Sequence, residues 1–136
     1  MDPVAITPDD DAFLNAFHTG AIRGFHHRDH LRLAWIHIKR LGFEAASGAV
    51  TKALRGFAQH HGDPDRYNDT MTRFWLRAVA IAIGRHPDLS FDALIGAEPH
   101  LLDKSLPFKH WSREQLTAGN AKASWVEPDL RPLPIG

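Results

Sequence analysis

The chain has 136 residues, and its 16 Lys and Arg balance its 16 Asp and Glu, so the formal net charge is zero at pH 7. Because no basic block concentrates on any stretch, the sequence lacks the electrostatic footprint of a nucleic-acid-binding protein. Hydrophobic residues make up 43% of the chain, which is typical of a globular domain, and no apolar run has the length needed to span a membrane.

The sequence contains no cysteine, which excludes disulfides, thiolate metal sites and a cysteine nucleophile. Its acidic start, MDPVAITPDDD, lacks the apolar stretch of a secretory signal. We therefore expect a cytoplasmic protein that forms a single domain over residues 1–136 and has neither a nucleic-acid partner nor a membrane partner.

Helix signals begin near the N-terminus. Thr7 is a favoured N-cap residue, Pro8 fits the first helical position, and three aspartates follow in the first turn. These signals predict a helix over residues 8–19. A second amphipathic stretch predicts a helix over 28–41, which Gly42 ends.

Two longer helices are expected next. Apolar residues at three- and four-residue spacing predict a helix over 44–61, and Gly62 follows it. The Asp-Pro-Asp sequence at 63–65 is a fresh start signal, so we expect the fourth helix over 65–85.

Residues 87–136 are less regular. Ser90 can cap a short helix, Ser112 opens a second one with a capping-box pattern, and the end of the chain, EPDLRPLPIG, is expected to be extended. The sequence therefore predicts an all-α fold: an antiparallel four-helix core, then short C-terminal helices and an extended proline-rich tail.

Histidine is the unusual component, with ten in the chain. Short connections make consecutive helices antiparallel neighbours, so the ends of helices 1 and 3 should meet the starts of helices 2 and 4 at one pole. Six histidines lie in those segments: His18, His26, His27, His30, His60 and His61.

Helical periodicity indicates which of these side chains point inward. At about 100° per residue, His27 lies on the axis of the expected buried stripe of its helix, His30 lies on the flank, and His61 extends the stripe of its own helix. Tyr67 and Thr70 face the same region from the fourth helix, and we expect both to orient a ligand. Three aspartates lie near them in sequence: Asp63, Asp65 and Asp69.

This cluster is a candidate metal site. His27 and His30 lie in the first turn of a helix, whose dipole favours the neutral imidazole that a metal ligand or general base requires. With His61 or Asp69 as the third ligand, and His61 the one assigned, they could hold a divalent metal such as zinc or iron. The zincin pattern H-E-x-x-H and the di-iron pattern Glu-x-x-His are both absent.

Two segments resemble those of a family of small, uncharacterised bacterial helical proteins, in which F-x-H-x-x-H-L precedes Y-H-x-T-x-T. The resemblance extends to the EPDL sequence near the C-terminus and so covers most of the chain. This sequence departs from the pattern at Asn68, where the family has histidine. The resemblance implies no activity. Its motifs carry onto Phe25, His27, His30, Leu31, Tyr67, Thr70 and Thr72.

Taken together, the sequence predicts a metal- or small-ligand-binding protein with its site at the histidine-rich pole. If it is an enzyme, metal-activated water or a histidine general base fits best, and no catalytic residue is assigned. The competing hypothesis is a non-catalytic interaction or structural module, in which the histidines are solvated and helices pair the chain into a homodimer.

Overall fold

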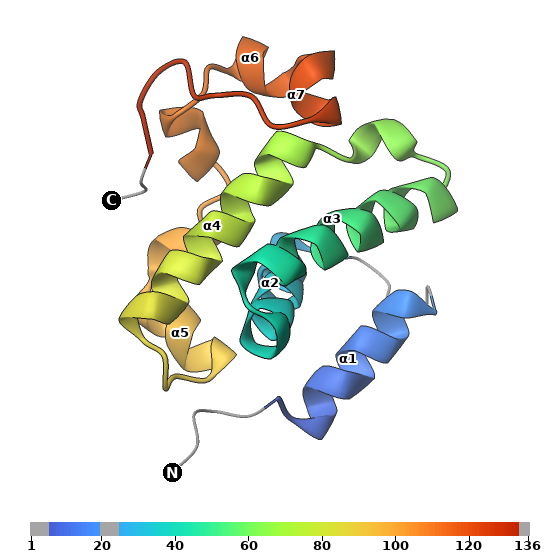
Figure 1. Ribbon diagram of the computed structural model, residues 1–136, viewed down its shortest axis with the longest axis vertical. Coiled ribbons are helices and arrows are strands. Elements are labelled where there is room, and N and C mark those ends of the chain that lie inside the picture. The colour runs from blue at the N-terminus through green and yellow to red at the C-terminus, as the bar shows by residue number, and fades with distance from the viewer. Residues whose placement is uncertain (1–5, 20–24, 134–136) are drawn as a thin grey trace.

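The computed structural model describes residues 6–19 and 25–133, and these residues form helices and connecting segments without a strand (Figure 1). The predicted all-α fold is confirmed. The α-helices are α1 (Pro8–His18), α2 (His27–Leu41), α3 (Phe43–His60), α4 (Asp69–Arg85), α5 (Phe91–Ala97), α6 (Arg113–Thr117) and α7 (Gly119–Ala123). Short 3-10 turns are η1 (Pro64–Arg66), η2 (Pro99–Leu102) and η3 (Leu106–Lys109). Within the described ranges, no helix combines the length and apolarity needed to cross a bilayer.

Helix α2 lies at the centre of the core and packs against both α3 and α4. Figure 1 views α2 nearly along its axis, with the start of α3 in front of it and α4 passing to its left. Its buried side chains lie on more than one face, and Leu41, the last residue of the helix, is 53% exposed. The buried side chains of α2 are Leu31, Leu33, Ala34, Trp35, Ile36 and Ile38.

Helix α1 is held against α2 by a buried carboxylate. Thr7 and Asp10 form the predicted N-terminal cap as a reciprocal capping box. Asp10 also accepts hydrogen bonds from Arg32 Nε at 3.2 Å and Nη2 at 2.9 Å. Burial alone would raise the pKa of the Asp10 carboxyl, but hydrogen bonds from Thr7 and Arg32 hold that pKa below its usual value.

Helix α4 begins later than the sequence predicted. The Asp-Pro-Asp start signal forms only the short turn η1, and the chain then extends through Tyr67. The α-helix starts at Asp69, because the Asn68 side chain caps it by accepting a hydrogen bond from Met71 N at 3.0 Å.

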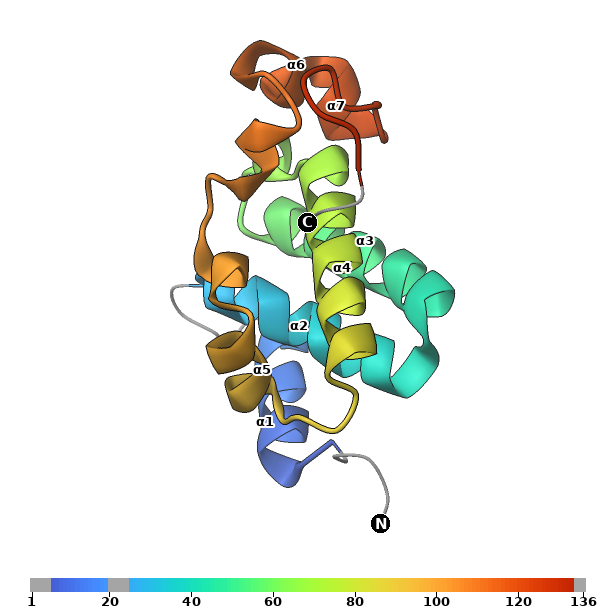
Figure 2. The ribbon, with the colours of Figure 1, turned by 90° about the vertical axis from the view of Figure 1, so that its left-hand side faces the viewer.

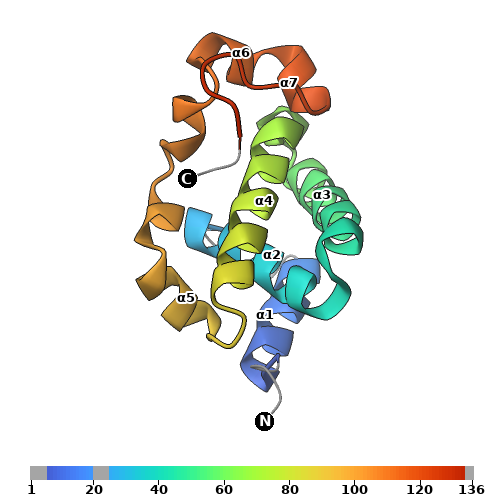
Figure 3. The ribbon, with the colours of Figure 1, turned by 60° about the vertical axis from the view of Figure 1, so that its left-hand side comes forward.

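The C-terminal part runs along α4 and covers its N-terminal half. Figures 2 and 3 show the segment from α5 to η3 rising beside α4, with α6, α7 and the tail lying across the top. The extended tail is fixed by its backbone: Leu130 N and Arg131 N both donate to His110 O, at 2.8 and 3.2 Å. Leu130 itself is 60% exposed, so its side chain does not anchor the tail.

Candidate functional site

Three helix ends and a set of phenylalanine rings meet at one pole of the molecule. Phe17 at the end of α1, Phe25 just before α2 and Phe57 near the end of α3 lie with ring centroids 5.1–5.2 Å apart. We call these three residues the phenylalanine cluster. The structure thus brings together the end of α1, the start of α2 and the end of α3.

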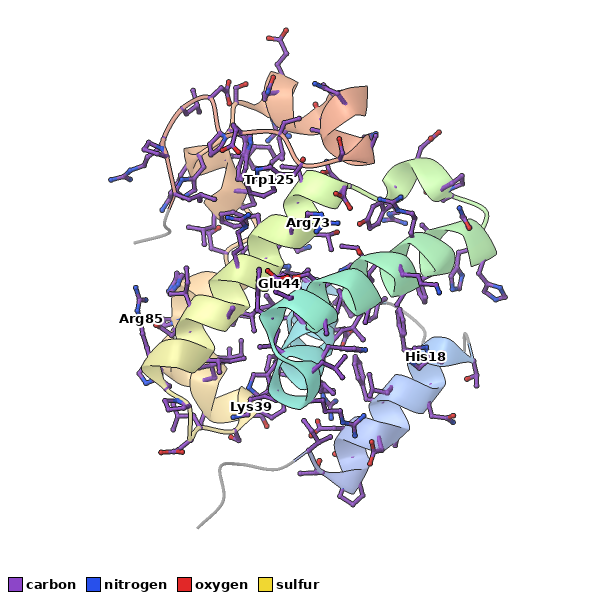
Figure 4. All side chains as sticks on the ribbon, in the orientation of Figure 1. His18, Lys39, Glu44, Arg73, Arg85 and Trp125 are labelled. Atoms are coloured by element: carbon purple, nitrogen blue, oxygen red, sulfur yellow. The ribbon has the colours of Figure 1, made fainter. Side chains whose placement is uncertain are left out.

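Histidines surround this cluster. His18 lies against Phe17 with ring centroids 5.5 Å apart, His30 against Phe25 at 4.4 Å, and His61 against Phe57 at 4.3 Å. His60 neighbours His61 at 5.2 Å. Figure 4 shows His18 at the end of α1, on the side of the molecule where α3 also ends. Each of the first three imidazoles therefore contacts a different ring of the phenylalanine cluster.

His30 has the most strongly shifted pKa of these histidines. Burial, reinforced by the nearby His27, lowers the pKa of His30 to about 4. The imidazole is therefore neutral near pH 7, as its place in the first turn of a helix predicted. A neutral imidazole has the protonation state required of a general base or metal ligand.

His27 lies in a different environment from the phenylalanine cluster. Its Nε2 is 2.8 Å from Leu101 O, and its ring packs on Trp75 with centroids 4.4 Å apart. A carbonyl can only accept, so Nε2 carries the proton and Nδ1 is the unprotonated nitrogen of the neutral ring. Burial lowers the pKa of His27, which favours this neutral form. Its Nε2 is thereby committed to the backbone of η2.

Two of the three predicted metal ligands, His30 and His61, border the phenylalanine cluster, whereas His27 has other contacts. His27 contacts η2 and α4, His30 contacts Phe25, and His61 is exposed beside Phe57. In residues 6–19 and 25–133, no three His, Asp or Glu side chains form a group that could hold a metal ion. The set His27, His30 and His61 stays a prediction.

Tyr67 contacts charged side chains near the start of α4. Its hydroxyl donates a 2.6 Å hydrogen bond to Asp69 Oδ1, and Arg55 lies over its ring at 4.9 Å. Burial and the bond to the Asp69 carboxylate raise the pKa of Tyr67 to about 12, so the phenol stays protonated. Asp69, which the sequence analysis considered as an alternative third metal ligand, accepts hydrogen bonds from Tyr67, Arg55 and Arg73.

Thr70 is fully buried and connects α4 to the C-terminal segment. Its hydroxyl lies 2.8 Å from Ala121 O and 3.0 Å from Ser124 O, and it accepts a 3.2 Å hydrogen bond from Val126 N. Through these bonds the Thr70 hydroxyl donates its hydrogen to backbone carbonyls and accepts a backbone N–H with one lone pair. The contacts of Tyr67 and Thr70 are therefore with the protein itself.

A small groove opens beside the phenylalanine cluster, between the ends of α1 and α3. Its volume is about 210 Å³. Apolar surface comes from two phenylalanines and an alanine, and polar atoms come from two histidines and a threonine. The lining residues are Phe17, His18, Thr19, Ala53, Gly56, Phe57 and His60. The sequence placed His18 and His60 at this pole but did not choose them as site residues.

The chain matches no family model, no curated protein and no solved structure. The resemblance to a family of small bacterial helical proteins therefore stays a prediction, and the function has to be argued from the geometry of the pole.

Proposed function

We propose that this protein binds a small ligand in the groove between the ends of α1 and α3. The observation that carries the proposal is the convergence of aromatic faces and imidazoles on one concave surface, since small-molecule sites combine apolar walls with a few polar groups. The groove volume of about 210 Å³ suits a compact molecule with a single ring. We further propose that the protein acts in the cytoplasm, as the sequence analysis led us to expect.

The helix ends favour a ligand that donates hydrogen bonds or carries positive charge. The C-terminal turns of α1 and α3 both line the groove, and helix C-termini carry partial negative charge from their unpaired carbonyls. None of the described residues that line the groove is Lys, Arg, Asp or Glu. Phenylalanine faces also attract cations. A small aromatic amine matches these features, and benzylamine is a suitable first probe.

Gly56 provides a sharp test of the groove. A Cβ added there meets no atom within 4 Å, and the same holds for Gly48, two turns earlier on α3 and outside the groove lining. Gly56→Leu should occupy the groove and weaken benzylamine binding at least tenfold, measured by NMR titration. Gly48→Leu should bind as the unmodified protein does, while both substitutions raise helix propensity by about 0.5–1 kcal/mol. Equal binding by all three proteins would place the ligand elsewhere.

The metal hypothesis has its own measurement. Protein purified without an affinity tag is analysed for zinc and iron by mass spectrometry, and less than 0.1 equivalent would count against the predicted site at His27, His30 and His61. Stoichiometric metal that disappears in a His27→Ala, His30→Ala double variant would instead support the metal site and displace the organic-ligand proposal.

One observation favours the competing interaction module. Leu41 and Phe43, on either side of the turn between α2 and α3, are 53% and 38% exposed. Exposed apolar side chains of this size can pair two copies of a chain. A homodimer held there should dissociate in a Leu41→Glu, Phe43→Glu variant, as followed by sedimentation velocity.

A further inference from the structure

A second polar cluster lies away from the histidine groove, where α3 faces the start of α4. Its centre is the Asp69 carboxylate, whose side chain is only 3% exposed. Arg55 Nη2 donates to Asp69 Oδ1 at 3.1 Å and Arg73 Nε donates to Oδ2 at 2.7 Å, while the Tyr67 hydroxyl supplies the third donor. We call Arg55 and Arg73 the arginine pair.

The arginine pair carries more charge than its carboxylate balances. In the described part of the chain, Asp69 is the one acidic side chain within ion-pair distance of either arginine, so the cluster holds two positive charges and one negative charge. A buried carboxylate can be satisfied by one arginine with hydroxyl or backbone donors, so the second arginine exceeds what a structural ion pair needs. The cluster therefore has a net charge of +1.

Most of the donors of the arginine pair are available to a ligand. A guanidinium has five N–H groups, and each arginine uses one of them on Asp69. The two side chains are 49% and 39% exposed, so their remaining N–H groups can reach solvent. Figure 4 places Arg73 on the part of α4 that lies next to the C-terminal segment carrying Trp125.

Two guanidinium groups held on one carboxylate suit a small oxyanion. Arg55 and Arg73 bind Asp69 Oδ1 and Oδ2 at 3.1 and 2.7 Å, so Asp69 fixes the position of both groups. The Tyr67 ring, which packs against the Arg55 guanidinium, further restricts the orientation of that group. Arginine forks match the oxygens of phosphate, and orienting them before binding reduces the entropy lost when the ligand arrives.

We propose that Arg55 and Arg73 form a binding site for the phosphoryl group of a small soluble phosphate compound, with Asp69 positioning both guanidinium groups. This site is separate from the histidine groove. Its ligand is recognised by charge and hydrogen bonding rather than by apolar walls.

Inorganic phosphate is the probe for this proposal. At pH 7.5 and constant ionic strength, replacing sodium chloride by 10 mM phosphate should raise the Tm of the unmodified protein by at least 2 °C, and phosphorus NMR line broadening should report millimolar binding. An Arg55→Met, Arg73→Met double variant should bind at least fivefold more weakly. Arg28→Met is the matched control, because Arg28 forms an exposed ion pair with Asp92 on a different face and should leave phosphate binding unchanged.

The single variant Arg55→Gln keeps the test informative if the double variant unfolds. Arg55 is half exposed, and in its absence Asp69 keeps Arg73 and Tyr67 as partners. Phosphate binding should then weaken at least twofold with the fold intact by circular dichroism. Chloride matching the effect of phosphate, or Arg28→Met losing as much binding as Arg55→Gln, would overturn the proposal. Sedimentation with phosphatidic acid vesicles but no response to soluble phosphate would assign the charge to a lipid surface and also overturn it.

Discussion

Thr70→Val is expected to lower the free energy of unfolding by about 2 kcal/mol and the Tm by about 6 °C. Valine has nearly the shape of threonine, so the core packing is preserved. The substitution removes the hydroxyl that Ala121 O and Val126 N share, and backbone groups left without partners in a buried setting are costly. Urea unfolding at pH 7.5 measures the loss.

We also expect the structure of the Thr70→Val variant to open first in one region, the C-terminal segment. Trp111 Nε1 donates to Val126 O at 3.0 Å, and its ring packs on Trp125 with centroids 5.4 Å apart. Faster amide exchange and a red-shifted tryptophan emission should therefore appear in the C-terminal segment before global unfolding. Thr72→Val is the matched control, since Thr72 makes no side-chain hydrogen bond within the described chain. Equal destabilisation by both valines would show that the hydrogen bonds of the Thr70 hydroxyl do not carry the effect.

The second large effect is a dependence of the free energy of unfolding on pH, which we attribute to His30. The pKa of His30 is about 4 in the folded protein and 6.5 in an unperturbed histidine. Between these values the unfolded chain binds a proton that the folded chain does not, so stability must fall as the pH decreases from about 6.5 to about 4. His30 is partly exposed, so we expect its contribution to be about 2 kcal/mol.

The substitution His30→Leu removes the titrating group while keeping an apolar side chain against Phe25. The variant should lose about 2 kcal/mol of the pH dependence between pH 6.5 and 4, measured by urea unfolding at four pH values. Some slope should persist, because burial also lowers the pKa of His27 and His37. Asp10 acts in a lower window: its depressed pKa gives stability that is lost only as the pH falls below about 4. Retention of the full slope by His30→Leu would rule out His30 as its source.

The helix ends were predictable because local chemistry sets them. Thr7, Ser90 and Ser112 cap the helices that follow them, and Gly42 at the end of α2 has a φ of 82°, which glycine adopts without strain. Short connections make consecutive helices antiparallel, so the end of α1, the start of α2 and the end of α3 were expected to meet at one pole. These features depend on a few neighbouring residues, so they can be predicted from a single sequence.

The partners of the site residues could not be predicted in the same way. His27 bonds to Leu101 and Thr70 to Ala121, across 74 and 51 residues of sequence. Such contacts depend on the path of the C-terminal segment, which shows no strong periodicity. The turn η1 also delayed the start of α4 to Asp69, so Tyr67 precedes the helix on which the sequence placed it. The spacing of Asp69 and Arg73, four residues apart, was the one local signal for the arginine pair.

The tie between Thr70 and the C-terminal segment has a consequence for synthesis on the ribosome. Helices α2, α3 and α4 leave the exit tunnel well before residues 121–126, which supply the backbone partners of Thr70. Until then Thr70 and the apolar face of α4 that packs on α7 are open to water. The nascent chain therefore acquires its full stability only after residues 121–126 have left the tunnel.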